Sequence, residues 1–274
     1  MPGVCFHLRR GLLHLRPCKR MSRPVLSLSI VSHGQLDLVS LLLADIKMHC
    51  DAAALEVILT LNIPEQLPVT LETFPFSLTV IQNLAPQGFG RNHNQAFQRA
   101  SGEFFGVINP DVRIGSNMFG PLLAGLSLPS VGVAAPLVVN HLGAFENSAR
   151  HFPTPLKILC KLFGRCQGAD YPIGQAPVYP DWAGGMFMLF RCDVYRQLGG
   201  FNEKYFLYYE DVDICARIWL KGLRVALIPE ARVTHEARRS SHQQAAYLLM
   251  HIRSMARFFL SVTFFKAMLL RRRR

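Results

Sequence analysis

The sequence predicts an α/β fold with a mostly parallel central sheet. Short apolar runs rich in β-branched residues alternate with helical stretches through the first half of the chain, and this rhythm is typical of parallel sheets covered by helices. Half of the 274 residues are hydrophobic, so the chain can bury a large core and most of it is expected to fold.

Polar residues follow the strands that are expected first along the chain. Strands are expected at 25–32, 56–61 and 78–81, and an apolar helix at 36–46. Ligands of parallel sheets bind outside the carboxyl ends of the strands. Ser32, His33 and Asn62 stand at such ends and are candidate nucleotide contacts, although a histidine at a strand end often has no special role.

A loop that contains glycine leads into the next expected helix, within residues 83–100. Its sequence GFGRNHN presents Arg91, Asn92, His93 and Asn94 at the start of the helix. Backbone amides and the helix dipole favour an anion there, which makes Arg91 and Asn94 candidate phosphate contacts. Any glycine-rich turn before a helix looks similar, so this motif is weak by itself.

A buried strand is expected at 104–108, and it runs directly into Asn109, Pro110 and Asp111. A Pro-Asp turn is a common way to end a strand, so this segment has a structural as well as a functional interpretation. Another short strand is expected at 131–136.

The pattern loosens between 140 and 180, where five prolines occur. Such a segment is typical of a variable excursion outside the core. Trp182 follows it, and a tryptophan there is either a core residue or a platform for a sugar face. Gly184, Gly185 and the Gly199-Gly200 pair mark sharp bends or close approaches of the backbone.

The densest acidic cluster is Glu210-Asp211-Val212-Asp213, directly after five mostly aromatic residues. Burial and repulsion between like charges raise carboxyl pKa values in such a place, which suits a general base. Acids at a helix start also complement the helix dipole, which is the structural alternative. The following helix is expected at 214–220 and the last strand at 225–228.

The net charge of +12 belongs to the two ends of the chain. Residues 1–20 carry five Lys or Arg and residues 237–274 carry nine, with no acid in either segment. The body, residues 21–236, holds 16 basic and 18 acidic residues, which argues against nucleic acid as a partner. Basic ends beside apolar residues suit an anionic membrane surface better.

The C-terminal tail, residues 241–274, is expected to form one basic amphipathic helix. Apolar residues recur at helical spacing from Ile252 to Leu269, and the chain finishes with four arginines. Such a helix either lies in a membrane surface or packs on the domain with a solvated basic end.

Seven cysteines without a CxxC pair argue against a disulfide framework and a structural zinc site, and favour a reducing cytosol. Residues 1–20 lack the continuous apolar core of a secretory signal. They are basic and poor in acid, so a transit peptide and a true start at Met21 are both open. Residues 1–23 are therefore treated as an N-terminal extension.

Taken together, the motifs resemble those of family 2 glycosyltransferases, especially the rhamnosyltransferase-like branch that builds bacterial surface polysaccharides. The resemblance rests on an ordered series: Trp182, Gly184-Gly185, the GGFNE turn at 199–203, Tyr208-Tyr209-Glu210-Asp211 and His235. Several ordered motifs within one short stretch are far more specific than any one of them.

The resemblance implies a GT-A fold over residues 24–240. It also implies transfer of a sugar, with rhamnose suggested by the branch, from a nucleotide-diphosphate donor to a hydroxyl of a glycan or lipid-linked glycan, with inversion. Asp211 would take the proton of that hydroxyl, and Glu210 would orient the acceptor or share the base role. The acceptor contacts are expected from Asp181, Trp182, Gly184 and Gly185.

On the donor side, the sequence NPD stands where the family carries an Asp-x-Asp motif that holds Mg²⁺ or Mn²⁺ against the diphosphate. Asp111 is the retained acid, Asn109 offers only a neutral oxygen, and His235 is a second expected contact. Relatives usually place an Asp-Asn pair after the second strand. This chain has Thr60-Leu61-Asn62-Ile63 there, so the contact is expected from Asn62 alone.

The main alternative is a catalytically inactive membrane-surface protein that binds sugar nucleotides, and the missing acid after the second strand is its only support. An enzyme that hydrolyses the donor and a nucleic-acid-binding protein are weaker alternatives. The preferred interpretation is an enzyme in the cytoplasm at the inner face of the cell membrane.

Overall fold

The computed structural model describes residues 8–9, 12–15, 24–67, 74–164, 168–235 and 244–271. The longer strands are β3 (Leu26–Ser32), β4 (Leu55–Leu61), β5 (Ser77–Gln82), β6 (Phe104–Ile108), β8 (Val131–Val139), β11 (Phe187–Arg191) and β12 (Arg224–His235). The shorter strands are β1 (Leu8–Arg9), β2 (Leu12–Leu15), β7 (Val112–Arg113), β9 (Ala149–Arg150) and β10 (Trp182–Ala183).

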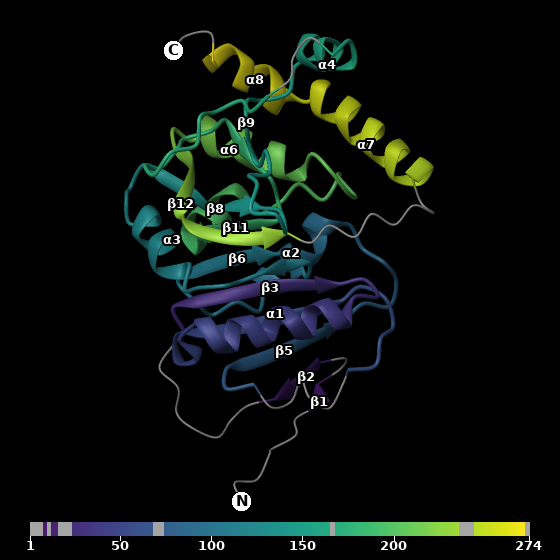
Figure 1. Ribbon diagram of the computed structural model, residues 1–274. Coiled ribbons are helices and arrows are strands. Elements are labelled where there is room, and N and C mark those ends of the chain that lie inside the picture. Colours follow the sequence, from purple (N-terminus) through teal and green to yellow (C-terminus); the bar gives the residue numbers. More distant parts are fainter. Residues whose placement is uncertain are drawn as a thin grey trace, which may run out of the picture.

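The helices of these residues are α1 (Leu36–His49), α2 (Phe89–Phe97), α3 (Phe119–Leu126), α4 (Pro155–Leu162), α5 (Cys192–Leu198), α6 (Glu210–Leu220), α7 (Gln244–Phe259) and α8 (Val262–Arg271), with a 3-10 turn at Ala52–Ala54. Figure 1 shows α1 lying across one half of the sheet, and α4, α7 and α8 gathered at the end of the molecule opposite β1 and β2.

Ten of the described strands form one sheet in the order β1-β2-β5-β4-β3-β6-β11-β8-β12-β7. The strands β5, β4, β3 and β6 are parallel to one another, and β12 is parallel to β8. The strand β11 lies antiparallel between β6 and β8, so β8 runs in the same direction as β6. The prediction of a mostly parallel sheet is confirmed.

Two hydrophobic cores cover the two faces of this sheet. One contains residues of α1 and α3, and the other contains residues of α2, α5, α6 and the C-terminal helices. Serines alternate with leucines along β3, and Ser27, Ser29 and Ser32 are as buried as their neighbours because both faces of the strand are covered. Ser29 bonds to the buried ring of His93, so these polar side chains have partners inside the fold.

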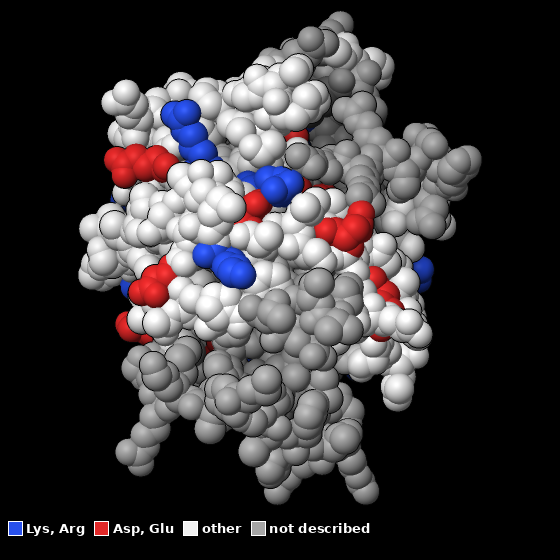
Figure 2. Space-filling view, turned by 60° about the horizontal axis from the view of Figure 1, so that its bottom comes forward, with Lys and Arg blue, Asp and Glu red and all other residues white. Residues whose placement is uncertain are grey.

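The body of the molecule has a mixed surface. On the face in Figure 2, Lys and Arg are scattered among Asp, Glu and uncharged residues, without a large described patch of one sign. This agrees with the nearly balanced charge of residues 21–236.

Several elements differ from the sequence-based expectation. The helix α6 begins at Glu210, four residues earlier than expected, so the acidic cluster forms its first turn. The excursion at 140–180 contains β9 and α4. The central strand β11 and the β1–β2 pair beside β5 were not expected. Met21 lies outside the described residues.

The single C-terminal helix predicted by its apolar spacing is wrong in detail, because it is two helices. Their axes differ by 63°. The Ser261 hydroxyl donates to the Phe258 carbonyl at 2.7 Å and accepts from the Phe264 amide at 3.1 Å, so it ends one helix and caps the next. The helix α8 packs on α6.

In the described part of the chain, no single helix is long and apolar enough to cross a membrane. The two C-terminal helices meet the length and composition criteria only when they are taken together.

Candidate active site

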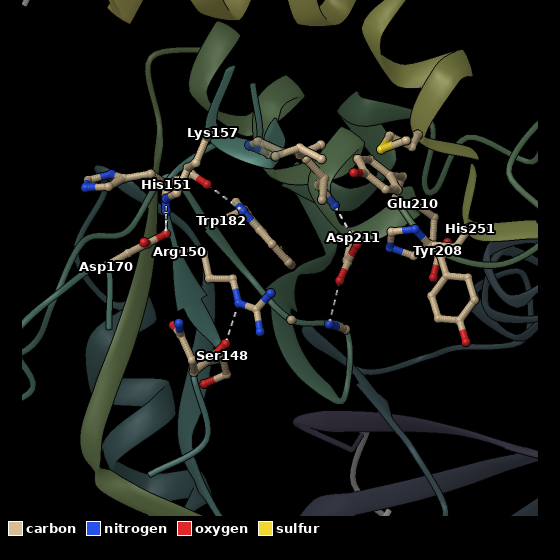
Figure 3. Close-up of a pocket in the computed structure, with 18 of the residues that line it drawn as sticks. Ser148, Arg150, His151, Lys157, Asp170, Trp182, Tyr208, Glu210, Asp211 and His251 are labelled. Atoms are coloured by element: carbon tan, nitrogen blue, oxygen red, sulfur yellow. Dashed lines mark hydrogen bonds and ion pairs between the residues drawn. The ribbon is translucent and has the colours of Figure 1, made fainter. Parts of the chain in front are cut away.

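A cavity of about 490 Å³ lies beside the first turn of α6 (Figure 3). Its lining includes Glu210 and Asp211, the Gly184–Met186 segment, residues around β9 and α4, and His251 and Met255 of α7. Trp182, Gly184 and Gly185, which the sequence predicted as acceptor contacts, all line it. The structure therefore brings the acidic cluster and most of the expected acceptor residues together.

The two carboxylates are placed by a strained turn. Tyr208 and Tyr209 have φ values of 68° and 67°, the left-handed region that bulky residues rarely adopt. Such strain persists where surrounding contacts impose it, and it is concentrated at functional sites. Here α7 provides those contacts: the Ser254 hydroxyl donates to the Leu207 carbonyl at 2.8 Å, and Phe258 packs against the Tyr209 ring.

Asp211 and Glu210 have different surroundings. Asp211 is partly exposed at the cavity, and its Oδ2 accepts from the Gly185 amide at 3.1 Å while its Oδ1 accepts from the Val212 amide. A Cβ at Gly185 would make an ordinary van der Waals contact with Asp211, so the two residues lie side by side at the cavity wall. Glu210 is 5% exposed, and its Oε2 is buried without a hydrogen-bond partner among the described residues.

Burial raises the pKa of both carboxyls. The neighbouring charge of Asp211 raises the pKa of Glu210 further, well above its ordinary value. For Asp211, hydrogen bonds from backbone amides and the charge of Arg150 oppose the rise. Two adjacent buried acids are costly to ionise together, and the amide donors favour the negative charge on Asp211. Glu210 is then the member that keeps its proton longer.

Arg150 and Trp182 form the opposite wall of the cavity. The Arg150 guanidinium carbon lies 5.6 Å from the centre of the Trp182 ring, and Figure 3 shows the guanidinium directed toward the side of Asp211. The Trp182 Nε1 donates to the His151 carbonyl at 3.0 Å. Trp182 is thus a fixed apolar face with a cation above it, which is suited to a sugar ring.

Asp181 is buried beside the cavity, and other groups of the protein occupy its carboxylate. It is 4% exposed, and its Oδ2 accepts from the Phe152 amide at 2.9 Å and lies 3.6 Å from the Arg271 guanidinium. Tyr171 and His151 complete this cluster beside the cavity. Its predicted contact to the acceptor stays a prediction, and the surroundings favour a role in supporting the wall that carries Trp182.

The end of β6 and the end of β12 bring Asp111 and His235 together. His235 pairs with Val112 across β12 and β7, which places its Nε2 3.3 Å from Asp111 Oδ2. The His235 Nδ1 lies 3.1 Å from Glu146 Oε2. Hydrogen bonding to Asp111, aided by Glu146, raises the pKa of His235. The other oxygen of Asp111 is buried and has no described partner.

The Gly184–Met186 segment connects this pair to the acidic cluster. The Asn109 amide donates to the Met186 carbonyl at 2.9 Å, and the Gly185 amide donates to Asp211. The two polar centres therefore lie on either side of one short, glycine-containing segment.

A network of amide side chains occupies the carboxyl ends of β4 and β5. The Asn62 Oδ1 accepts from the Asn83 side chain at 2.9 Å and from the Gln87 amide at 2.7 Å. Its Nδ2 contacts His33 Nδ1 at 3.2 Å and donates to the Gln87 carbonyl. Asn83 also donates to Asn92. The side chain of Asn62 is thus fully used inside the protein.

An acid does stand near the second parallel strand, at Glu65. Its Oε2 accepts from the Ser32 hydroxyl at 3.1 Å, while its Oε1 is buried without a described partner. Sequence reasoning missed Glu65 because it sought the acid directly after the strand, whereas Glu65 stands four residues after Leu61, the last residue of β4, and contacts the end of β3 through Ser32.

Arg91 and Asn94 lie on other faces of α2. Arg91 is exposed and lies 3.9 Å from Glu203. The Asn94 side chain donates to the Phe201 carbonyl and accepts from the Phe201 amide and the Tyr195 hydroxyl. Their donor contacts stay predictions, and the contacts of Asn94 favour a brace for the 199–203 turn. Asn92 is the residue of this motif that joins the amide network.

The sequence matches the family described as Glycosyltransferase like family 2 over residues 53–257. A curated relative from Mycobacterium tuberculosis, N-acetylglucosaminyl-diphospho-decaprenol L-rhamnosyltransferase, is 30% identical over 166 residues, which cover 54% of this chain and 52% of the relative. The chain thus spans about half the length of that relative. Rhamnosyltransferase WbbL of Escherichia coli is 40% identical over 57 residues, which cover 21% of this chain and 22% of WbbL.

Solved structures share the fold at low identity. GalNAc-T7 with UDP, GalNAc and Mn²⁺ superimposes with a TM-score of 0.62 at 16% identity, over 80% of this chain and 44% of that one. The mannosyltransferase PcManGT from Pyrobaculum calidifontis, in complex with GDP-Man and Mn²⁺, gives 0.61 at 16% identity, over 86% and 65%. The family match and the architecture agree: this chain belongs to glycosyltransferase family 2 and has the GT-A fold.

Proposed function

We propose that this protein transfers a sugar from a nucleotide-diphosphate donor to a hydroxyl of a glycan or lipid-linked glycan, with inversion at the anomeric carbon. The observation that carries the proposal is the placement of Asp211, which lies at the wall of a cavity with two backbone amides on its carboxylate. The family membership supports the reaction class.

Asp211 is the general base in this proposal. It accepts the proton of the acceptor hydroxyl, whose oxygen attacks the anomeric carbon as the nucleoside diphosphate leaves from the opposite face. A base acts best with a pKa close to the working pH, and burial moves the Asp211 pKa in that direction. Glu210, directly beside it, keeps its proton and spares the site a second buried charge.

The donor lies along the carboxyl ends of β3, β4 and β6. The free, buried oxygen of Glu65 is suited to accept hydrogen bonds from ribose hydroxyls or from a base N–H. The amide network of Asn62 and its neighbours fixes the loop before α2. Asn109 and Asp111 lie where the diphosphate would follow.

The residues at Asp111 suit a divalent cation in part. Asp111 has a buried oxygen without a partner, and an imidazole nitrogen lies beside its other oxygen; carboxylate and imidazole are both ligands that Mn²⁺ accepts. Among the described residues, no three His, Cys, Asp or Glu side chains are arranged so that they could hold a metal ion by themselves. Asp111 and His235 would therefore hold Mn²⁺ or Mg²⁺ together with the donor phosphates. A bound cation would neutralise charge on the leaving diphosphate.

The relatives suggest the donor and the acceptor. The mycobacterial relative is named for the transfer of L-rhamnose to a lipid-linked N-acetylglucosamine diphosphate, and the E. coli relative is also a rhamnosyltransferase. We infer a nucleotide-linked deoxyhexose such as rhamnose as the donor sugar and a lipid-linked glycan as the acceptor.

Calorimetry tests the donor site. UDP-, dTDP- and GDP-sugars are titrated with Mn²⁺, with Mg²⁺ and without metal. One nucleotide is expected to bind, more tightly with the cation. Asp111→Ala should remove the metal dependence, and Glu65→Gln should weaken donor binding by about tenfold because a charged hydrogen bond becomes a neutral one.

The matched control for Glu65→Gln is Glu103→Gln, which changes an exposed glutamate directly before β6, at the opposite end of that strand from Asp111, and which should bind the donor normally. If the folded protein gave no binding heat with any of the nucleotide sugars, the proposed donor site would be contradicted. Donor binding without turnover on any acceptor would instead favour the inactive sugar-nucleotide-binding protein.

A further inference from the structure

The helices at one end of the molecule expose several large apolar side chains. We define the apolar end surface by six of them: Leu156 and Phe163 at α4, Leu248 and Leu249 on α7, and Phe265 and Leu269 on α8, each between 56% and 76% exposed. The three helices lie together in Figure 1. An exposed apolar group of this extent normally marks an interaction site.

The same helices carry only positive charge. The described residues of α4, α7 and α8 include no Asp or Glu. Arg253 and Arg257 of α7 line a cavity of about 330 Å³ together with Lys204 and Phe206, and no acidic residue lines it. Within the described part of the chain, none of these three basic side chains forms an ion pair.

Apolar residues with unneutralised cations on the same helices match the boundary of an anionic bilayer, where acyl chains and phosphate groups lie side by side. A protein partner would have to supply both an apolar face and several acids in fixed positions. A bilayer supplies both without a fixed arrangement, and lysine and arginine side chains can reach its headgroups while their helix lies flat.

We propose that α4, α7 and α8 form a docking surface for an anionic phospholipid bilayer. The surface lies on the membrane and does not cross it, because the inner sides of α7 and α8 belong to the protein core. Phe258 and Ala267 are at most 2% exposed, and α8 packs along α6. A bilayer crossing would pull both residues out of that core.

Docking places the catalytic cavity at the lipid surface. Lys157 and Ile158 of α4 and His251 and Met255 of α7 line the cavity that holds Asp211. The helices that contact lipid are thus the helices that border this cavity. An acceptor with a lipid anchor could enter the cavity from the bilayer while its anchor stays in the membrane. The docking itself does not depend on the proposed transfer reaction.

Vesicle co-sedimentation of the full chain tests the proposal. Vesicles of phosphatidylcholine are compared with vesicles of phosphatidylcholine and phosphatidylglycerol, at low and high salt. Strong binding is expected only with phosphatidylglycerol, and it should weaken as salt screens the charges. The double variant Leu249→Asp, Phe265→Asp and the double variant Arg253→Gln, Arg257→Gln should each lose at least tenfold in vesicle affinity.

Matched controls come from the rest of the surface. Leu84→Asp changes a fully exposed leucine on the loop before α2, and the double variant Arg99→Gln, Lys221→Gln removes two exposed cations elsewhere. Both controls should bind vesicles as the parent protein does, and circular dichroism checks that every variant is folded.

Equal binding to neutral and anionic vesicles, or loss of binding in the controls alone, would overturn the proposal. So would a dimer in light scattering that becomes a monomer in Leu249→Asp, Phe265→Asp without any vesicle binding by the parent, because a second copy would then cover the surface. Failure of donor binding in calorimetry would leave the docking result unaffected.

Discussion

At the scale of single residues, the adjacent acids at the start of α6 have different contacts, and for this reason the proposed mechanism gives them separate roles. Both line the cavity, but Asp211 accepts from two backbone amides, whereas the Glu210 Oε2 is buried without a partner among the described residues. Two carboxyls this close titrate as a unit, so a titration curve cannot be assigned to either one. Substituting each acid in turn distinguishes their contributions to catalysis.

Asp211→Asn should lower kcat by about a thousandfold, since a positioned general base contributes on the order of 10²–10⁴. Donor binding should survive, because Asp211 faces the acceptor side of the cavity. Glu210→Gln keeps the shape and the neutral charge of the protonated acid. Because Glu210 is not the base in this mechanism, the variant should retain kcat within about tenfold of the parent value. Steady-state kinetics with each variant measures both, and a larger loss in Glu210→Gln than in Asp211→Asn would reverse the assignment.

The pH profile follows from the raised pKa values. The base must be ionised, so kcat/KM should fall as pH decreases through a value above the ordinary carboxyl range. The folded state binds these protons more tightly than the unfolded chain, so the contribution of the pair to stability increases as pH falls through the raised pKa. Glu210→Gln replaces a protonated neighbour with a neutral amide, so it should leave the acid limb set by Asp211 in place and raise the melting temperature at alkaline pH, where Glu210 would otherwise ionise inside the fold.

At the scale of elements, the turn between α5 and α6 fits against α2 at one point. Gly199 and Gly200 both have φ of +71°. A Cβ at Gly200 would overlap the side-chain oxygen of Asn94, whereas a Cβ at Gly199 would meet open space. Asn94 holds this turn through the Phe201 backbone. The turn therefore requires glycine at 200 for two reasons: its left-handed backbone and the room that Asn94 needs.

Gly199→Ala should lower the free energy of unfolding by about 1–2 kcal/mol, the cost of a left-handed alanine. Gly200→Ala should lower it by roughly a further 1–3 kcal/mol, because the displaced Asn94 leaves buried polar groups without partners. Urea denaturation of the two variants measures the difference, and equal destabilisation would mean that Asn94 adapts without cost.

The C-terminal helices act on the site through the strained turn. The bond from Ser254 to the Leu207 carbonyl and the packing of Phe258 on Tyr209 hold a backbone conformation that two tyrosines would not adopt alone. The helix that carries part of the apolar end surface therefore also fixes the segment that presents Glu210 and Asp211.

At the scale of the whole molecule, one edge of the sheet collects the predicted donor contacts and one end collects the helices proposed to face lipid, with the cavity of Asp211 beside both. If transfer and docking both operate, lipid should concentrate the enzyme at an embedded acceptor. Leu249→Asp, Phe265→Asp should then slow turnover of a lipid-linked acceptor in anionic vesicles by about tenfold or more.

The same double variant should turn over a water-soluble acceptor with the same terminal sugar at the parent rate. The ratio of the two rates is the measurement. An equal loss on both acceptors would show that the substitutions damage the site and not the docking.

Much of the fold could be predicted because its signals are local. Alternation in 25–32 predicted β3, and β4, β5 and β6 follow from similar runs. The strand β11 was missed because its pattern FMLFR is a short apolar run that fits a helix or a strand equally well. Its place between β6 and β8 is set by pairing with residues far away in the sequence.

The C-terminal helices show where local reasoning stops. Apolar spacing predicted one helix, and Ile252, Phe258 and Phe265 all belong to its apolar set. Ile252 and Phe265 are exposed, whereas Phe258 is buried together with Phe264 and Ala267, because the break at Ser261 turns the second helix onto α6. The break at Ser261 thus decides which apolar residues of the two helices are buried in the core and which are exposed.

The sequence by itself determined the family, the parallel sheet and the motif that holds the acids, since each of these depends on residues close together along the chain. Only the tertiary structure decided that Glu65 lies beside Ser32 near β4 and that the surroundings of Asp211 and Glu210 differ, and it brought together Asp111 and His235, which the family resemblance had suggested as neighbours. The reason is physical: hydrogen-bond partners and burial are set by strands and helices that meet across long sequence separations, and no local pattern encodes those meetings.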